Sequence, residues 1–190
     1  MSESASLSES EFQVHTTRSA PEASRALLQG LQEHVGFVPN LAATMAESPA
    51  LLSAFLGLRS AAGTGSLSAM EREIIAIAVA TETGCTYCVA AHSTFALKCG
   101  APAAAVEAVR AGRDPEDARV EALARFARAV VRRADVGPAV RRLRESGSSA
   151  AQVLDAVAAI AVPLLAGSAF QVTAAALDDP FRPQAWTRRG

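Results

Sequence analysis

Three residues between positions 85 and 92 have the side chains of a redox-active site. Cys85, Cys88 and His92 stand at i, i+3 and i+7, so on an α-helix they fall on one stripe and can meet in space. Thr83-Gly84 breaks the preceding segment, and a helix that begins near Cys85 would place both thiols in its first turns, where the helix dipole favours a thiolate. His92 lies one turn beyond Cys88 and can take or stabilise its proton. The pattern indicates a reactive dithiol.

Three further residues belong to this region. Glu73 lies twelve residues before Cys85 in an apolar segment, where a carboxylate needs a polar partner such as a backbone amide or an arginine. Tyr87, between the two cysteines, could serve packing or proton transfer. Cys99 shares the stripe but lies some three turns, ~16 Å, beyond Cys88. We expect Cys99 to be a small core residue outside the dithiol.

The spacing Glu-x11-Cys-x2-Cys-x3-His resembles the core motif of the alkylhydroperoxidase D-like proteins of the carboxymuconolactone decarboxylase superfamily. The likeness extends to the flanking VPNLAATMAESPALLSAFL and LSAMEREIIAIAVA, together roughly residues 36–100. The alkylhydroperoxidase itself has a second histidine between the cysteines, where this chain has Tyr87. Subgroups described only as peroxidase-related carry such a tyrosine. The resemblance implies a compact all-α domain of the alkylhydroperoxidase D-like type in the peroxidase-related subgroup.

The same resemblance implies a thiol peroxidase with no prosthetic group or metal that acts through a Cys85-Cys88 disulfide cycle. Cys88 would be the peroxidatic thiolate and Cys85 the resolving one. His92 would serve as the base towards Cys88, with Glu73 orienting it or relaying the proton, and Tyr87 would be a candidate relay. The substrate would be a hydroperoxide, and an external dithiol, lipoylated in the related alkylhydroperoxidase, would reduce the disulfide.

Other functions remain open on the same residues. The same groups could bind zinc, since two thiolates, an imidazole and a carboxylate are all zinc ligands. However, no second CxxC or paired histidine accompanies them. A redox sensor could use the same dithiol, although no DNA-binding element is evident. A decarboxylase-like enzyme of the superfamily is a third alternative, but that branch lacks the CxxC.

The length, charge and composition of the chain limit the kinds of protein that it can be. A chain of 190 residues is long enough for one domain that buries on the order of 70% of its unfolded surface. The formal net charge of −1 gives no attraction to nucleic acid or to an anionic membrane. No signal-peptide pattern is present, and apolar runs such as 156–166 are too short to span a bilayer. With three cysteines, two of them in a CxxC, we expect a cytoplasmic protein.

The positioning elements should all be helices, because no segment shows sustained alternation of apolar and polar residues. We expect residues 1–18 to form a mobile arm in which His15 is solvated. Residues 19–177 should form the single domain, and residues 178–190 a C-terminal tail. The spacing of Ser19 and Glu22 predicts a capping box. We expect helices at 20–34, 40–46, 49–61, 68–82, 85–99, 114–134, 137–146 and from 149 onward.

Several secondary expectations follow from the remaining patterns. Pro163 and Gly167 predict a kink or break in the last helix. Residues 148–162 resemble residues 67–81 at an offset of 81, which suggests a degenerate second copy of the helical unit. Apolar helix faces, with Phe181 and Trp186 in a tail that looks exposed, predict a homo-oligomer. A basic stripe should be a solvated face partly paired with Glu121 and Asp117, and it comprises Arg125, Arg128 and Arg132.

Overall fold

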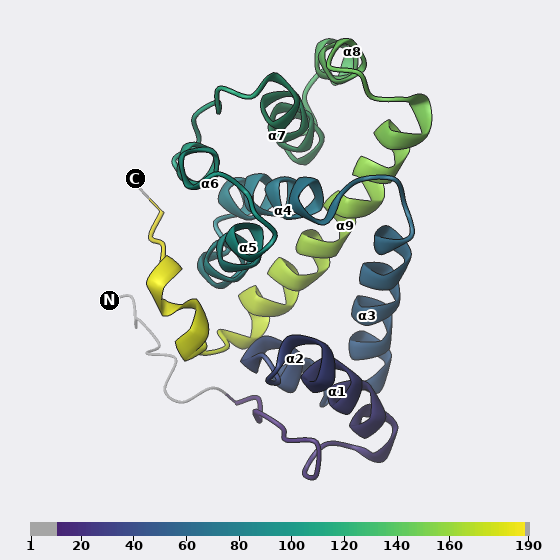
Figure 1. The fold of residues 1–190 in the computed structure, drawn as a ribbon. Coiled ribbons are helices and arrows are strands. Elements are labelled where there is room, and N and C mark those ends of the chain that lie inside the picture. The colour runs from purple at the N-terminus through teal and green to yellow at the C-terminus, as the bar shows by residue number, and fades with distance from the viewer. Residues whose placement is uncertain (1–10, 189–190) are drawn as a thin grey trace, which may run out of the picture.

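The computed structural model describes residues 11–188, and within that range the chain is helical and contains no strand. The all-α fold expected from the sequence is confirmed. Figure 1 shows its helices in chain order. They are α1 (Glu22–Val35), α2 (Asn40–Met45), α3 (Pro49–Gly63), α4 (Ala69–Thr83), α5 (Thr86–Lys98), α6 (Ala103–Arg110), α7 (Ala118–Val131), α8 (Gly137–Glu145), α9 (Ala150–Thr173) and the 3₁₀ helix η1 (Asp179–Gln184).

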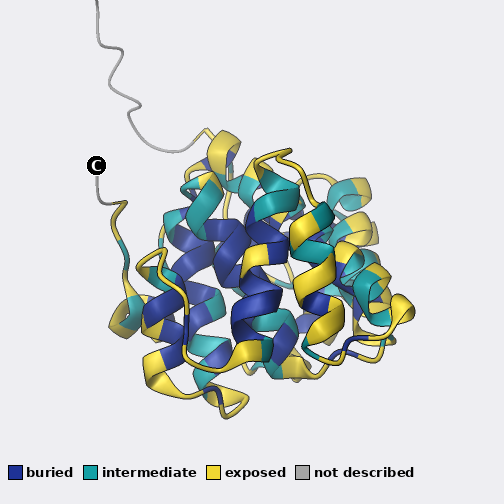
Figure 2. Ribbon diagram, turned by 90° about the horizontal axis from the view of Figure 1, so that it is seen from above, coloured by how far each residue is buried: buried dark blue, intermediate teal, exposed yellow. Residues whose placement is uncertain are grey.

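Helix α4 is the central element of the bundle. Its apolar side chains are buried on nearly all sides, and it packs against α5, α7 and α9 (Figure 1; the buried helices are dark blue in Figure 2). A capping box begins the helix: Ser68 accepts from the backbone N–H of Glu71, whose carboxylate accepts from the N–H of Ser68. Gly84 ends it in the left-handed conformation, with φ of 72°. These two signals fix the register of the helix that carries Glu73.

Helix α9 is continuous over 24 residues, although Pro163 lies inside it. The sequence predicted a kink or break there, and the helix shows no break. Its capping box, formed by Ser149 and Gln152, stands 81 positions after that of α4, as the suggested internal repeat would require. The second copy differs because α9 runs on where α4 ends and α5 begins.

By length and composition α9 could cross a membrane, since its mean hydropathy reaches 2.0. The helix crosses the middle of the bundle and packs on α3 and α4, as the core helix of a soluble protein does (Figure 1). Its outer face nevertheless exposes four large apolar side chains, which are Leu154, Val157, Leu164 and Val172.

The expected N-terminal arm lies partly outside the described residues, which begin at residue 11. His15, expected to be solvated, is buried: its Nε2 lies 2.5 Å from a carboxylate oxygen of Glu47. Ser19 lies against the other side of the imidazole, with its hydroxyl 3.4 Å from Nδ1. The hydroxyl of Ser19 therefore does not cap α1, which starts after Pro21 without a side-chain cap. The prediction of a capping box here was wrong.

The C-terminal tail folds back onto its own chain. In η1, Phe181 is 1% exposed, and its ring packs against Tyr87, Phe95 and Phe37. The indole N–H of Trp186 donates to the carbonyl of Arg110 at 3.1 Å. Aromatic residues of the tail are thus partnered within the chain, and they lend no support to an oligomer.

The basic stripe of α7 is paired with Glu121, as expected, but not with Asp117, and it is not wholly solvated because Arg128 is buried. Asp117 caps α7 by accepting from two backbone N–H groups. Asp114 lies 2.5 Å from Arg125, Glu82 lies 2.7 Å from Arg132, and Glu121 bonds Arg125 across one turn.

Candidate functional site

The dithiol lies at the junction of α4 and α5. Gly84 turns the chain with a backbone conformation that L side chains rarely adopt, and Cys85 follows as the N-cap of α5. The sulfur of Cys85 accepts a hydrogen bond from the backbone N–H of Cys88 at 3.1 Å. The two residues form a disulfide, with their Cα atoms 5.2 Å apart. Both sulfurs therefore lie at the positive end of the α5 dipole, where a thiolate is stabilised.

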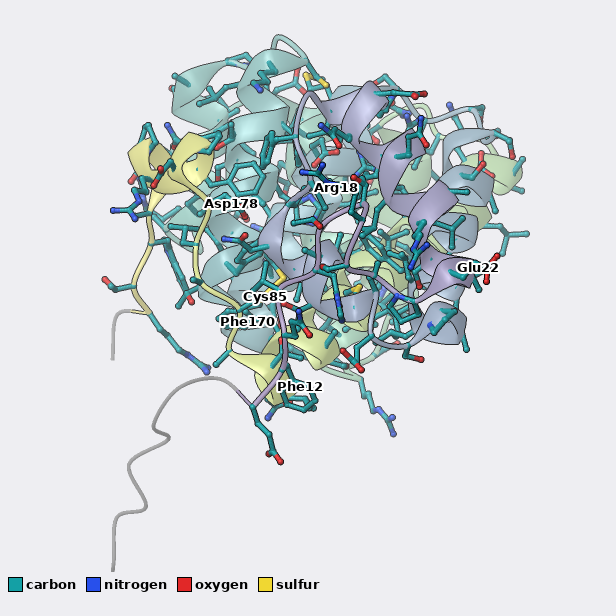
Figure 3. The ribbon with its side chains drawn as sticks, turned by 90° about the horizontal axis from the view of Figure 1, so that it is seen from below. Phe12, Arg18, Glu22, Cys85, Phe170 and Asp178 are labelled. Carbon is teal, nitrogen blue, oxygen red and sulfur yellow. A yellow bond between two sulfur atoms is a disulfide. The ribbon has the colours of Figure 1, made fainter. Side chains whose placement is uncertain are left out.

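The two sulfurs differ in what they face. Cys85 is 4% exposed and Cys88 is 2% exposed, so both belong to the core around α1, α2 and α5. Cys88 lines a small apolar pocket of about 50 Å³ that His92 also borders, whereas Cys85 does not line it. Cys85 instead lies towards α9 (Figure 3). A small molecule in this pocket would meet the sulfur of Cys88 first.

Glu73 of α4 and His92 of α5 form a pair across the two helices. The Nδ1 atom of His92 lies 2.7 Å from a carboxylate oxygen of Glu73. Both side chains are largely shielded, with 13% of His92 and 17% of Glu73 exposed. The partner that a carboxylate in this apolar segment requires is thus the imidazole. With Nδ1 held by the carboxylate, Nε2 is the ring nitrogen left for proton transfer.

A larger cavity of about 620 Å³ opens beside the pair. Glu73 and His92 line it, together with residues of α1, α3 and α9. Three residues border both this outer cavity and the inner pocket at Cys88: Leu31, Arg59 and His92. They form the boundary at which the larger outer cavity adjoins the smaller, apolar pocket at the sulfur.

Tyr87 also borders the inner pocket, but its hydroxyl is engaged elsewhere. The hydroxyl donates to a carboxylate oxygen of Asp178 at 2.5 Å and accepts from the N–H of Leu41 at 3.3 Å. Burial raises the pKa of Tyr87 far above its ordinary value, and the hydrogen bond to Asp178 and its charge add to the rise. These contacts favour packing over proton transfer, the two roles that the sequence left open.

Asp178 and Arg59 are site components that the sequence did not reveal. Asp178, just before η1, also accepts from the backbone N–H of Asn40 at 3.0 Å and so joins the tail to α2 and α5. No local pattern distinguished it from other acids of the tail. Arg59 stood on a helix with no charged neighbour at i±3 or i±4 to draw attention.

Cys99 is exposed, so the prediction of a core residue was wrong. Helix α5 ends at Lys98, and Cys99 follows as its C-cap, where the chain leaves the stripe shared by Cys85, Cys88 and His92. In the part of the chain that the structure describes, no three His, Cys, Asp or Glu side chains lie close enough together to hold a metal ion. The zinc alternative finds no ligand set there.

A dithiol lies at the start of one helix, and a Glu–His pair joins that helix to the one before it, which is the arrangement that the resemblance to alkylhydroperoxidase D-like proteins leads us to expect. Comparisons with known proteins agree. The carboxymuconolactone decarboxylase family matches residues 49–132, from α3 to the end of α7. The matched region contains Glu73, Cys85, Cys88 and His92, and together with the solved structures described next it supports membership of the alkylhydroperoxidase D-like and carboxymuconolactone decarboxylase superfamily.

Solved structures share the fold over almost the whole chain. An uncharacterised peroxidase-related protein of Ralstonia eutropha JMP134, described as an alkylhydroperoxidase AhpD core, is 25% identical with a TM-score of 0.79, and the match covers 93% of this chain and 96% of that one. The debrominase Bmp8, solved as a cysteine-to-alanine variant in complex with 2,3,4-tribromopyrrole, is 20% identical with a TM-score of 0.78 over 93% and 97% of the two chains. A peroxidase-related protein of Silicibacter sp. TM1040 is 23% identical with a TM-score of 0.78 over 92% and 93%.

One curated relative matches a shorter stretch. It is an uncharacterised protein of Cupriavidus necator, 45% identical over 51 residues. The match covers 26% of this chain and 45% of the relative, so less than half of that protein is represented.

Proposed function

We propose that this protein is a CxxC-dependent thiol peroxidase that reduces hydroperoxides through the Cys85-Cys88 dithiol. One observation carries the proposal: Cys88, at the start of α5, lines a narrow pocket with His92, whose other side is bonded to Glu73. A nucleophile, a base within the same pocket and a group that orients the base are the parts that covalent catalysis needs. The peroxidase-related description of the Ralstonia protein supports this class of chemistry.

In the first step, His92 takes the thiol proton of Cys88, and the thiolate attacks the terminal peroxide oxygen. The O–O bond breaks, Cys88 becomes a sulfenic acid, and the leaving oxygen takes the proton from His92 to give an alcohol, or water from hydrogen peroxide. In the second step, the Cys85 thiolate attacks the sulfur of Cys88, and the sulfenic hydroxyl leaves as water once protonated. The products are the alcohol, water and the disulfide.

The disulfide is returned to the dithiol by an external dithiol. Because Cys88 faces the pocket, the incoming thiolate attacks the sulfur of Cys88 and Cys85 leaves as a thiolate, which the N–H of Cys88 at the helix start stabilises. The second thiol of the reductant then attacks the mixed disulfide, which leaves a cyclic disulfide on the reductant and frees Cys88. A lipoylated partner fits this scheme by resemblance, and a reducing cytoplasmic setting would supply it.

A homo-oligomer is part of the same proposal, now on a different surface from the tail. The exposed apolar residues of α9, Leu154, Val157, Leu164 and Val172, recur at the spacing of one helical stripe. A second copy of the same stripe is a self-complementary partner for it, as in a closed symmetric dimer or a larger ring.

Single-turnover kinetics with one equivalent of hydroperoxide test the roles of the two sulfurs. Cys88→Ser should abolish peroxide consumption, whereas Cys85→Ser should consume one equivalent and stall at a sulfenic acid on Cys88. Peptide mapping of the oxidised parent should show a Cys85-Cys88 disulfide with Cys99 reduced, and Cys99→Ser is the matched control with unchanged turnover. Loss of the first turnover in Cys85→Ser but not in Cys88→Ser would reverse the roles.

The Glu73→Gln variant tests the orienting group, since it keeps the shape and removes the charge that holds Nδ1 of His92. We expect the single-turnover rate to fall ~10²-fold, the size of one general acid–base contribution, with the fold intact by thermal melt. A variant that loses stability but keeps its rate per folded molecule would give Glu73 a structural role only. If none of the Cys88, Cys85 and Glu73 variants differed from the parent, peroxide reduction would be refuted in favour of redox sensing.

A further inference from the structure

Arg59 stands where the outer cavity meets the inner pocket. It lies on α3 and borders the pocket at Cys88 as well as the cavity beside Glu73 and His92. Its guanidinium carbon lies 5.7 Å from the ring centroid of Phe95, so a cation–π contact steadies the group against α5. A half-buried cation is thereby held at the boundary between the outer cavity and the pocket that Cys88 lines.

Within the part of the chain that the structure describes, this guanidinium has no anionic partner. Five arginines of the described residues are buried or half-buried, and four of them donate to a carbonyl, an amide or a carboxylate; these are Arg72, Arg110, Arg119 and Arg128. Among residues 11–188, Arg59 has no hydrogen bond or ion pair. A partly desolvated guanidinium with all of its donors unused is a binding group for a planar anion such as a carboxylate, which it can hold with two parallel bonds.

The charge of the outer cavity points the same way. Its lining includes a second arginine, Arg72, in addition to Arg59, while the one acid among the described residues that line it, Glu73, is bonded to His92. The remaining lining is mostly apolar and comes from α1, α3 and α9. A volume of about 620 Å³ is of the size that encloses a drug-sized organic molecule. A ligand that has an apolar body and an acidic group would fit a cavity of this size, lining and charge.

We propose that Arg59 binds a carboxylate on the substrate, so that the substrate class is organic hydroperoxides that carry a carboxylate on an apolar body. This inference rests on the proposed peroxidase function. The hydroperoxide group enters the inner pocket, whose volume of about 50 Å³ is far smaller than the 620 Å³ of the outer cavity, and the apolar body stays in the outer cavity. Hydrogen peroxide, with no carboxylate, gains nothing from Arg59.

A matched pair of substrates tests the proposal on the full-length protein. The probes are cumene hydroperoxide carrying a para-carboxylate and the methyl ester of the same compound. For the parent, kcat/KM should favour the acid, mostly through KM. In Arg59→Met the acid-to-ester ratio of kcat/KM should fall ~10–100-fold, the effect of a charge-assisted hydrogen bond, and Arg59→Lys should restore part of it. Arg72→Gln removes a cation from the outer cavity only and should change the ratio less than about twofold.

Three results would overturn the inference: equal kcat/KM for acid and ester in the parent, equal losses on both in Arg59→Met, or the same fall in the ratio in Arg72→Gln. A calorimetric experiment distinguishes failure of the Arg59 inference from failure of the peroxidase proposal. It measures binding of 4-isopropylbenzoate and of its methyl ester, neither of which is a peroxide, to the oxidised protein. If the parent reduced no hydroperoxide yet bound the benzoate at least tenfold more tightly than Arg59→Met, the anion site would stand and the peroxidase would not. No difference between the two proteins would refute the anion site itself.

Discussion

Removing the hydroxyl of Tyr87 tests how the C-terminal tail is joined to the dithiol helix. In Tyr87→Phe, Asp178 loses the donor at 2.5 Å and keeps only the backbone N–H of Asn40 at 3.0 Å. A hydrogen bond to a charged acceptor contributes about 1.5–3 kcal/mol, and here the acceptor stays buried. We expect the free energy of unfolding to fall by about 2 kcal/mol and Tm by about 4–8 °C for a chain of this size.

The contact between Tyr87 and Asp178 also predicts how the stability of the protein depends on pH. The pKa of Tyr87 is raised in the folded protein, first by burial and then by Asp178, from an ordinary value of 10.0. Above pH 10 the unfolded chain loses the phenolic proton while the folded chain keeps it, so the folded state binds more protons and its stability falls as pH rises. The stability gap between the parent and Tyr87→Phe should therefore be full below pH 10 and narrow above it, by about 1.4 kcal/mol per pH unit.

The assay is direct because Tyr87 is the single tyrosine of the chain. Phenolate absorbance should appear near pH 10 in denaturant but not in the folded protein at that pH, and urea titrations at pH 8 and 11 should give the two stability gaps. Asp178→Asn is the matched control: the tyrosine should ionise at lower pH than in the parent yet still above 10, since burial persists. A folded parent whose tyrosine titrated near pH 10 would refute the buried Tyr87–Asp178 contact.

Two further predictions concern the turn before the dithiol and the outer face of α9. Gly84→Ala should lower the free energy of unfolding by about 1 kcal/mol, because the φ of Gly84 is 72°. Gly36→Ala is the control: with φ of 92° at Gly36, urea titration should show the same cost. Gly84→Ala alone should alter the rate of disulfide reduction, since only Gly84 precedes Cys85. The double substitution Leu154→Glu and Val172→Glu should convert an oligomer to monomers, as measured by light scattering. Val136→Glu, which lies on a different surface, should leave the oligomer intact. An assembly that survived the double substitution would exclude the α9 stripe as its interface.

Local signals in the sequence predicted the elements that carry the candidate site. The capping box of Ser68 and Glu71 and the glycine at position 84 delimit α4, and both act through contacts within a few residues of themselves. The periodicity of α5 likewise predicted that Cys85 and Cys88 would lie together. The residues that such signals misplaced depend on distant partners: His15 is buried because Glu47, 32 positions away, bonds its ring.

Helix ends limited the prediction in another way. Extending the stripe of α5 to position 99 assumed that the helix continued, but it ends at Lys98 and Cys99 is turned to solvent. In the tail, prolines hid a 3₁₀ helix whose Phe181 is among the most buried side chains of the described residues. Contacts between residues 87 and 178, 91 positions apart, leave no periodic trace in the sequence. Their chemistry became visible only through the fold.

The burial of the dithiol constrains how the proposed cycle is completed. Because both cysteines are less than 5% exposed, a protein surface has no direct access to their sulfurs, and a reductant must present its thiols on a slender arm. The pocket that Cys88 lines borders the outer cavity at Arg59 and His92, so this junction is an approach that the peroxide and the arm would share in turn. Sharing one approach requires the alcohol to leave before the reductant enters, which is the order of a ping-pong cycle. A cation at the junction then acts on both halves of the cycle, since a carboxylated product that lingered at Arg59 would delay reduction of the disulfide.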